Sequence, residues 1–370
     1  MVMDDEKARI RRAEDYLKRV CCGDALSIDD ALYAESRFFR ALGVVQGEIV
    51  FNKEKPRINT EIVVRSSDGD RAITLKAPLM FSVPDARVNG HETHGIEYDA
   101  RRGFRDACQD VGTFFDGYGI EPSDVALWSS TKRSVNVIDK CQIIVLRIWD
   151  NAFPRTPMDM DGFSDLEKHI GMLREVNKKT LIGVEINMRN LCRGVRVCVE
   201  AGADFLVINS EQLALTAGSV GKKEIERNQS VNAAIHALIA VNKCVQGLGK
   251  KIPVILRGNL ITGTEVFKTL ALGADIVSIT HAHVMALNQI LCEEKGKRAG
   301  KDKLYDTAYN ILINYYRALC GEIASLLSYT NHNSPQELSK DDLVSYDYSV
   351  SAITGVKLAG YNKPLPMWMH

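Results

Sequence analysis

The sequence lacks the features that mark nucleic-acid-binding, membrane-spanning and secreted proteins. Its 47 basic and 47 acidic residues give a formal net charge of zero, so no global attraction to nucleic acid or to an anionic membrane is expected. No run approaches the roughly 20 apolar residues that span a bilayer, and residues 1–12 contain no apolar signal core. We therefore expect a cytoplasmic protein without a nucleic-acid or membrane partner.

Cysteine pairs with the spacing of metal or redox sites are also missing. The nine cysteines are scattered, and none forms a Cys-x-x-Cys motif. Cys21 and Cys22 are adjacent, but adjacent residues on a helix point in different directions. We expect buried thiols in a reducing compartment, no disulfide framework and no metal site.

The 370 residues contain no internal repeat, low-complexity tract or long linker, and 45% are hydrophobic, as in one compact unit. Residues 1–75 are expected to form an N-terminal helical adaptor followed by a β-hairpin. The helical part extends to about residue 45, and Asp68-Gly69 is a hairpin turn signal between two strand-like runs. We expect the hairpin to cover the floor of the main domain.

From residue 76 the pattern alternates between short apolar runs and helix-length amphipathic segments. Such alternation predicts an α/β fold with parallel strands, and eight runs predict a (β/α)8 TIM barrel over residues 76–300, although periodicity alone does not exclude a doubly wound sheet. The expected strands are 77–81, 111–115, 125–128, 142–148, 181–186, 205–209, 252–256 and 276–280. The expected helices include 166–176, 191–201 and 232–248. Residues 301–370 should add a long helix, 303–329, and a tail that packs on the barrel.

The segment 251–288 predicts an anion site. One strand ends at Arg257-Gly258-Asn259, where glycine lets the backbone approach a ligand. A helix follows, with Thr264 as its expected cap and Gly273 at its end. The next strand ends at Thr280-His281-Ala282. Two such loops bind phosphate in many barrels; the alternative is a structural unit in which Gly258 only serves a turn.

Other polar residues lie at expected strand ends, where a barrel keeps its reactive groups. Glu185 could act as a base or bind a substrate cation, or could form a buried ion pair with Arg147. Arg147 could itself bind a carboxylate or a cofactor edge. His281 could donate to phosphate or transfer protons, whereas His281 and His283 as a solvated pair is the simpler reading.

Several motifs together resemble the FMN-binding barrel domain of glutamate synthase, in its short archaeal and related single-domain forms. Segment 183–186 followed by 194–208, GVRVCVEAGADFLVI, is similar to one strand–helix–strand unit of that family. Arg257-Gly258-Asn259, Thr262-Gly263 and Leu272-Gly273-Ala274-Asp275 are similar to its Asp-Gly-Gly, Thr-Gly and Leu-Gly-Ala-Asp motifs. The resemblance covers about half of the chain. It implies an FMN phosphate site formed by a set of loop residues: Arg257, Gly258, Asn259, Gly263, Thr280, His281 and Ala282.

The sequence departs from that family where the flavin ring would lie. The position of the family's mid-barrel lysine is occupied by Glu185, and a carboxylate opposes an anionic reduced ring. The family's glycine-rich loop is replaced by bulkier residues at 209–218. Only Cys292 remains of three cysteines that hold an iron–sulfur cluster, so no cluster is expected.

The resemblance implies a glutamate synthase-like, FMN-dependent oxidoreductase that converts 2-oxoglutarate to glutamate by reductive amination. Glu185 and Arg147 are its expected catalytic residues, and a separate protein or free ammonia would supply nitrogen and electrons. Two alternatives stay open: a barrel that has lost flavin and serves as a binding or regulatory subunit, and a barrel enzyme for another phosphorylated ligand. The substrate would be a small molecule, and a homo-oligomer is not excluded.

Overall fold

The computed structural model describes residues 2–47, 58–66, 69–82, 98–116, 125–128, 139, 141–147, 165–186, 191–209, 223–293 and 301–361. Within these ranges, eight strands form one sheet in the order β5-β4-β11-β10-β9-β8-β7-β6. Every hydrogen-bonded pair in this sheet is parallel, and β5 and β6 at its two ends lie side by side. The strands thus follow one another in chain order around a circle, which is the arrangement of a (β/α)8 barrel.

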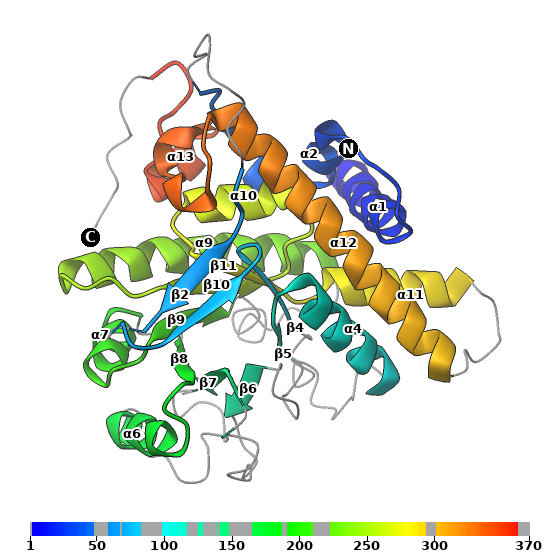
Figure 1. Cartoon of the computed structure of the whole chain (residues 1–370). Helices are drawn as coiled ribbons and strands as arrows, with labels where there is room; N and C mark the ends of the chain where they lie inside the picture. The colour runs from blue at the N-terminus through cyan, green and yellow to red at the C-terminus, as the bar shows by residue number, and fades with distance from the viewer. Residues whose placement is uncertain are drawn as a thin grey trace.

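The barrel strands are β4 (Leu79–Ser82), β5 (Phe115–Asp116), β6 (Val125–Trp128), β7 (Ile143–Arg147), β8 (Leu181–Ile186), β9 (Phe205–Asn209), β10 (Val254–Gly258) and β11 (Ile276–Ile279). The helices that follow or connect them are α4 (Tyr98–Val111), α6 (Leu166–Val176), α7 (Leu191–Glu200), α9 (Lys223–Gly247), α10 (Gly263–Ala271) and α11 (Ala282–Glu293). The long helix α12 (Lys301–Thr330) crosses the molecule diagonally in Figure 1, with α4 and α11 beside its lower end.

Most expected elements are confirmed, but several boundaries were wrong; β10, for example, spans Val254–Gly258 where 252–256 was expected. Val111 ends α4, and the following strand β5 consists of only Phe115 and Asp116. The cap of α10 is Thr262, not Thr264, because the Thr262 hydroxyl accepts the amide hydrogen of Glu265. Helix α9 begins at Lys223, nine residues earlier than expected.

The N-terminal and C-terminal segments form a shared layer outside the barrel. The N-terminal part consists of α1 (Val2–Cys21), α2 (Ile28–Ala34), α3 (Arg37–Arg40) and β1 (Leu42–Val44), and the C-terminal part of β12 (Leu343–Ser345), α13 (Tyr348–Thr354) and two 3₁₀ turns, Pro335–Glu337 and Lys340–Asp342. Strand β1 pairs antiparallel with β12, a link that the sequence did not predict. The division of the chain at residues 75 and 300 stays a prediction.

The expected hairpin is confirmed as β2 (Ile62–Arg65) and β3 (Ala72–Leu75), paired antiparallel. Its apolar side chains join a cluster made of the inward-facing residues near the amino ends of the barrel strands, such as Leu181, Phe205 and Ile255. This packing places the hairpin under the floor of the barrel, as predicted.

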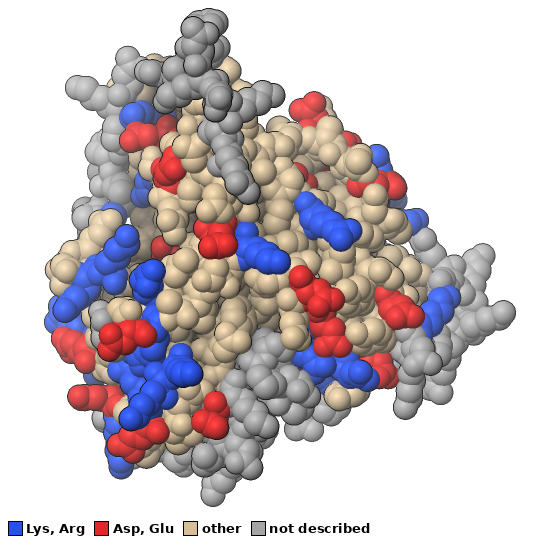
Figure 2. Space-filling view, in the orientation of Figure 1, with Lys and Arg blue, Asp and Glu red and all other residues tan. Residues whose placement is uncertain are grey.

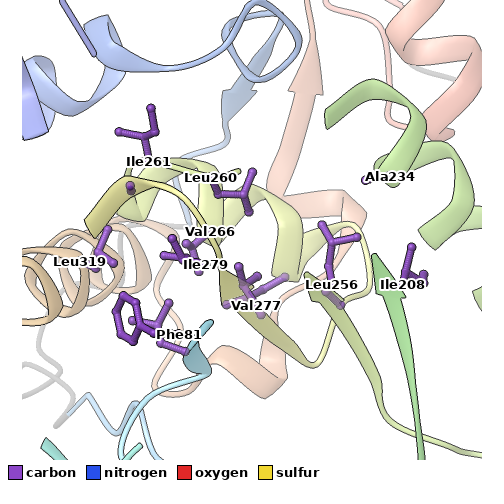
Figure 3. Packing of buried hydrophobic residues seen from close by; sticks show 14 of the residues in the cluster. Phe81, Ile208, Ala234, Leu256, Leu260, Ile261, Val266, Val277, Ile279 and Leu319 are labelled. Atoms are coloured by element: carbon purple, nitrogen blue, oxygen red, sulfur yellow. The ribbon is translucent and has the colours of Figure 1, made fainter. Parts of the chain in front are cut away.

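A second and larger hydrophobic cluster lies between the strands and the surrounding helices. Figure 3 shows part of it, where Leu256 and Val277 on the outer face of the sheet lie below Val266 of α10 and Leu319 of α12. Many other charged side chains lie at the surface, and Figure 2 shows both signs interspersed on the face that carries α12. No described helix is long and apolar enough to cross a membrane.

The cysteines depart from expectation at one place. Cys192 at the start of α7 and Cys244 near the end of α9 form a disulfide, with their Cα atoms 5.5 Å apart. Of the free cysteines described, four are buried, as expected: Cys21, Cys108, Cys141 and Cys198. No group of three or more metal-binding side chains occurs in the described part of the chain.

Candidate functional site

A layer of polar side chains fills the barrel interior near the carboxyl ends of the strands. Alternate residues of a strand face opposite sides of a sheet, and in β10 Ile255 packs inside the barrel while Val254 and Leu256 pack outside. Arg257 therefore faces inward. Among the side chains that the structure describes, the same alternation on the other strands adds five inward polar residues to Arg257. The six are here called the polar layer: Ser82, Asp116, Glu185, Asn209, Arg257 and Ser278.

The hydrogen bonds within the polar layer confirm this arrangement. Arg257 Nη1 donates to Asp116 Oδ2 at 2.6 Å, and both side chains are buried. Because β5 and β10 are separated by two strands on one side of the barrel, this ion pair crosses the interior. Ser278 and Ser82 hydroxyls are 3.3 Å apart. The layer is thus internally bonded and desolvated, and its charges act at low dielectric.

Glu185 belongs to the part of the polar layer on β8, which is separated from β10 by β9 alone. It is fully buried, and its Oε1 accepts a hydrogen bond from Asn209 Nδ2 at 3.3 Å. Arg147 is its register partner on β7, so the two expected catalytic residues lie on adjacent strands at the same level. The position of the Arg147 side chain is outside the described structure.

Pairing of β10 with β11 brings the expected phosphate-binding residues together. The amide of Thr280 donates to the carbonyl of Gly258 at 3.2 Å, so the loop that starts at Asn259 and the loop at His281 leave the barrel side by side. Thr280 and Ala282 are fully buried, whereas Asn259 and His281 are partly exposed. The Thr280 hydroxyl and His281 Nδ1 are 2.7 Å apart. Backbone and imidazole donors therefore gather at one edge of the barrel mouth.

Gly263 does not join this group, although the resemblance implied that it would. Its amide donates to Glu322 Oε2 at 2.7 Å, and a Cβ at this position would lie 2.7 Å from the carbonyl oxygen of Leu319 in α12. Gly263 is therefore needed for close contact between α10 and α12. The N-terminus of α10 is occupied by a carboxylate of the chain itself.

His281 and His283 point to different environments rather than forming a solvated pair. His283 is fully buried, with both ring nitrogens lacking a partner among the described residues. Its ring lies edge-on to Phe81, Phe104 and Phe115. Burial lowers the pKa of His283 to about 3, and the nearby His281 adds to this shift. His283 is thus a neutral core residue, and only His281 remains available to a ligand.

Below the polar layer the barrel is filled by apolar side chains. A Cβ added to Gly183 would lie 2.0 Å from the Phe205 ring, so the missing side chain at residue 183 makes room for that ring. Other inward-facing residues, such as Val145 and Ile255, complete this apolar filling of the barrel. A ligand can therefore be held above the polar layer but cannot pass through the barrel.

Some expected site segments lie outside the described residues. These are the loop 210–222 after β9, residues 187–190 after β8 and the side chain of Cys292. Asp116, Ser82 and Ser278 were not identified as site residues from the sequence. What would have indicated them is a polar residue in an inward-facing position at the end of an apolar strand. This position can be recognised only when the strand boundary is known.

The fold is similar to that of solved α/β barrels over most of the chain. The flavin-binding domain of baker's yeast flavocytochrome b2 superposes with a TM-score of 0.55 at 14% identity, over 93% of this chain and 91% of that domain. A mandelate oxidase solved with (S)-4-hydroxymandelic acid gives a TM-score of 0.51 at 15% identity, over 89% of this chain and 96% of that one. At these identities the likeness shows the fold alone.

Sequence comparison finds similarity to glutamate synthases over part of the chain. Residues 149–295 match the family model for the conserved region in glutamate synthase. A glutamate synthase large subunit-like protein of Rhizobium meliloti is 25% identical over 236 residues, which are 55% of this chain and 52% of that protein. An archaeal-type glutamate synthase [NADPH] of Dehalococcoides mccartyi is 30% identical over 152 residues, covering 39% of this chain and 29% of that protein. The chain thus contains a glutamate synthase-like domain, and it spans about half of the first of these relatives and less than a third of the second.

Proposed function

We propose that the protein is an FMN-dependent oxidoreductase of the glutamate synthase type. The observation that carries this proposal is the convergence of Gly258-Asn259 with Thr280-His281 beside a buried polar layer, on a barrel with a glutamate synthase-like domain. In barrels, the loops after the last two strands are the usual place for a phosphate. We call residues 258–262 the phosphate loop.

The donor set at this edge fits the phosphate of FMN. Backbone amides next to glycine approach an anion closely, and a partly exposed imidazole at His281 can add a charge-assisted hydrogen bond. Bound FMN would supply hydride transfer. The remaining residues of the barrel mouth would bind and orient the substrate.

The polar layer suits a small anionic substrate such as 2-oxoglutarate. Arg257, and Arg147 on β7, are cations that can bind carboxylates in bidentate fashion. Glu185 and Asn209 could orient a nitrogen that carries protons, since a carboxylate favours a cationic group beside it. The reaction proposed is reductive amination: ammonia replaces the carbonyl oxygen, which leaves as water, and two electrons and two protons complete glutamate.

One observation favours a second candidate, a barrel that binds its ligand without redox chemistry. Arg257 is already engaged by Asp116 inside the barrel, and Glu185 places a further carboxylate near the expected ring position. A reduced flavin anion is stabilised by a cation at this place, and the described residues offer none that is not matched by a carboxylate.

The colour of the purified protein separates these candidates. Flavin absorbance with release of FMN on denaturation supports the oxidoreductase, whereas a colourless protein that cannot be reconstituted with FMN refutes it. The variant G258L should weaken FMN binding. The matched control is G171L, since an added Cβ at Gly171 in α6 meets nothing within 4 Å; equal affinity in both variants would disprove the placement.

A glutamate-formation assay tests the reaction itself. The reconstituted protein is incubated with 2-oxoglutarate, ammonium and a chemical reductant of flavin, and glutamate is measured. If the protein binds FMN but forms no glutamate, the proposed cofactor would stand and the proposed substrate would be wrong.

A further inference from the structure

The far end of the phosphate loop is held by three side chains from two helices, α10 and α12. Glu265 Oε2 accepts the amide hydrogen of Ile261 at 2.7 Å, and the Tyr315 hydroxyl donates to the carbonyl of Ile261 at 2.5 Å. Glu322 Oε2 accepts the amides of Gly263 and Thr264 at 2.7 and 3.3 Å. All of these side chains are buried. These hydrogen bonds therefore fix the backbone from residue 261 to residue 264 on the side away from the barrel mouth.

Glu322 is itself held by the first helix of the chain. Its other oxygen, Oε1, accepts a hydrogen bond from the Tyr16 hydroxyl of α1, and Tyr16 is 3% exposed. The carboxylate thus bridges α1 and α10 from its position in α12. With both oxygens in use, its rotamer is determined by partners on two other helices.

The free amides at a helix N-terminus ordinarily attract anions. At α10 the carboxylate of Glu322 already fills that role, so a ligand phosphate is left to the loops at Gly258 and His281. The two ends of the phosphate loop then differ in role. The end at Gly258 faces the ligand, and the end at Ile261 is held in place by hydrogen bonds. An anchor only a few residues away limits how far the ligand-facing end can move.

We propose that Glu322 and Tyr16 are positioning residues that hold the phosphate loop in its ligand-binding conformation. This proposal rests on the FMN site proposed above. Neither residue touches the ligand; Glu322 acts through the amides of Gly263 and Thr264, and Tyr16 acts through Glu322.

The charge state of Glu322 provides a signature of this role. Burial raises the pKa of its carboxyl to about 7. The titratable groups around it are Tyr16 and Cys21 of α1, Glu35 at the end of α2, Glu265 and Lys268 of α10, and Tyr315 of α12. A charged carboxylate accepts amide hydrogen bonds more strongly than a neutral one, so the anchor should strengthen from pH 6 to pH 8.

The test combines hydrogen exchange of residues 259–264 with FMN affinity in the full-length protein. E322A removes the acceptor and should speed exchange of these amides and weaken FMN binding, each by about tenfold or more. E322Q keeps an acceptor and should restore most of the protection. It should abolish the pH dependence of protection between pH 6 and 8, after correction for intrinsic exchange rates.

Two further variants keep the result decisive. Y16F removes a single hydroxyl and should give a smaller effect in the same direction, which is measurable even if E322A does not fold. N177A is the matched control, because Asn177 bonds two carbonyls at the amino end of β7, those of Asp139 and Cys141; it should lower stability without changing exchange in 259–264.

Unchanged exchange in E322A and Y16F, or an unchanged pH dependence of protection in E322Q, would overturn the positioning role, as would an equal effect of N177A. A wild-type protein that binds no FMN would instead reject the proposed function. The exchange measurements would still decide whether Glu322 anchors the loop.

Discussion

The ion pair between Arg257 and Asp116 makes a quantitative prediction about the barrel mouth. The two charges lie 2.6 Å apart with side chains only 2% and 7% exposed. Removing one partner of a buried pair costs about 3–5 kcal/mol, because the remaining charge loses its compensation. D116N keeps an oxygen that can accept from the guanidinium, so we expect the lower end, about 3 kcal/mol.

Replacing both charges should be much less harmful. In the double variant D116L/R257M neither charge of the pair is left buried, and its stability should lie within about 1–2 kcal/mol of the wild type. Urea unfolding of the wild type, D116L, R257M and the double variant gives the coupling energy between the residues. A coupling energy below about 0.5 kcal/mol would show that the two charges do not compensate each other inside the barrel.

The same variants report on substrate binding. If Arg257 binds a substrate carboxylate, Asp116 competes with that carboxylate in the wild type. 2-Oxoglutarate should therefore stabilise D116N more than it stabilises the wild type, and should not stabilise R257M. Equal stabilisation of all three proteins would place the substrate elsewhere.

Three further predictions concern the core and the disulfide. The pKa of His283 is about 3 in the folded chain, so the unfolded chain takes up a proton first as the pH drops, and the free energy of unfolding should fall between about pH 6.5 and pH 3. H283L should flatten this slope and add about 1–3 kcal/mol at neutral pH. Urea titrations of H283L at pH 7 and 5 that match the wild type would contradict this account. G183A should cost about 1–3 kcal/mol, since its Cβ meets the buried Phe205 ring, and a wild-type thermal midpoint would show that the ring can move. Reduction of the Cys192–Cys244 disulfide, whose cysteines are 52 residues apart, should lower the free energy of unfolding by about 2–4 kcal/mol. The unfolding midpoint of the wild type should therefore fall when dithiothreitol is added, and the midpoint of C192S should not change.

Local patterns predicted the barrel strands well because each buried strand is a continuous apolar run of its own. Strands β6, β8 and β9 have the predicted bounds, and long-range information adds little there. Strand β5 is different, since only two residues pair with β4 and the preceding helix continues to Val111. The cap of α10 was misassigned because Thr262 and Thr264 are both good capping residues, and only the backbone conformation distinguishes them.

For the candidate site, the sequence indicates which residues lie at strand ends but not which side chains meet. Gly258 ends a buried strand, and Asn259 and His281 lie just beyond one; these positions can be read from the sequence. Asp116 and Arg257 are 141 residues apart, and their meeting depends on the closure of the barrel and on its register. Glu322 lies on an amphipathic helix with no motif around it, so nothing local indicated that its carboxylate would cap α10.

The link between the first and last segments has a consequence for the folding of the chain during synthesis. Tyr16 is synthesised 306 residues before Glu322, which accepts its hydrogen bond, and Glu35 is synthesised 233 residues before its ion-pair partner Lys268. Strand β1 likewise has no partner until β12 has been made. The N-terminal helices therefore leave the ribosome long before the surfaces that bury them exist, so this layer must dock last. A chain truncated before α12 would leave the Tyr16 hydroxyl and the N-terminal amides of α10 without Glu322.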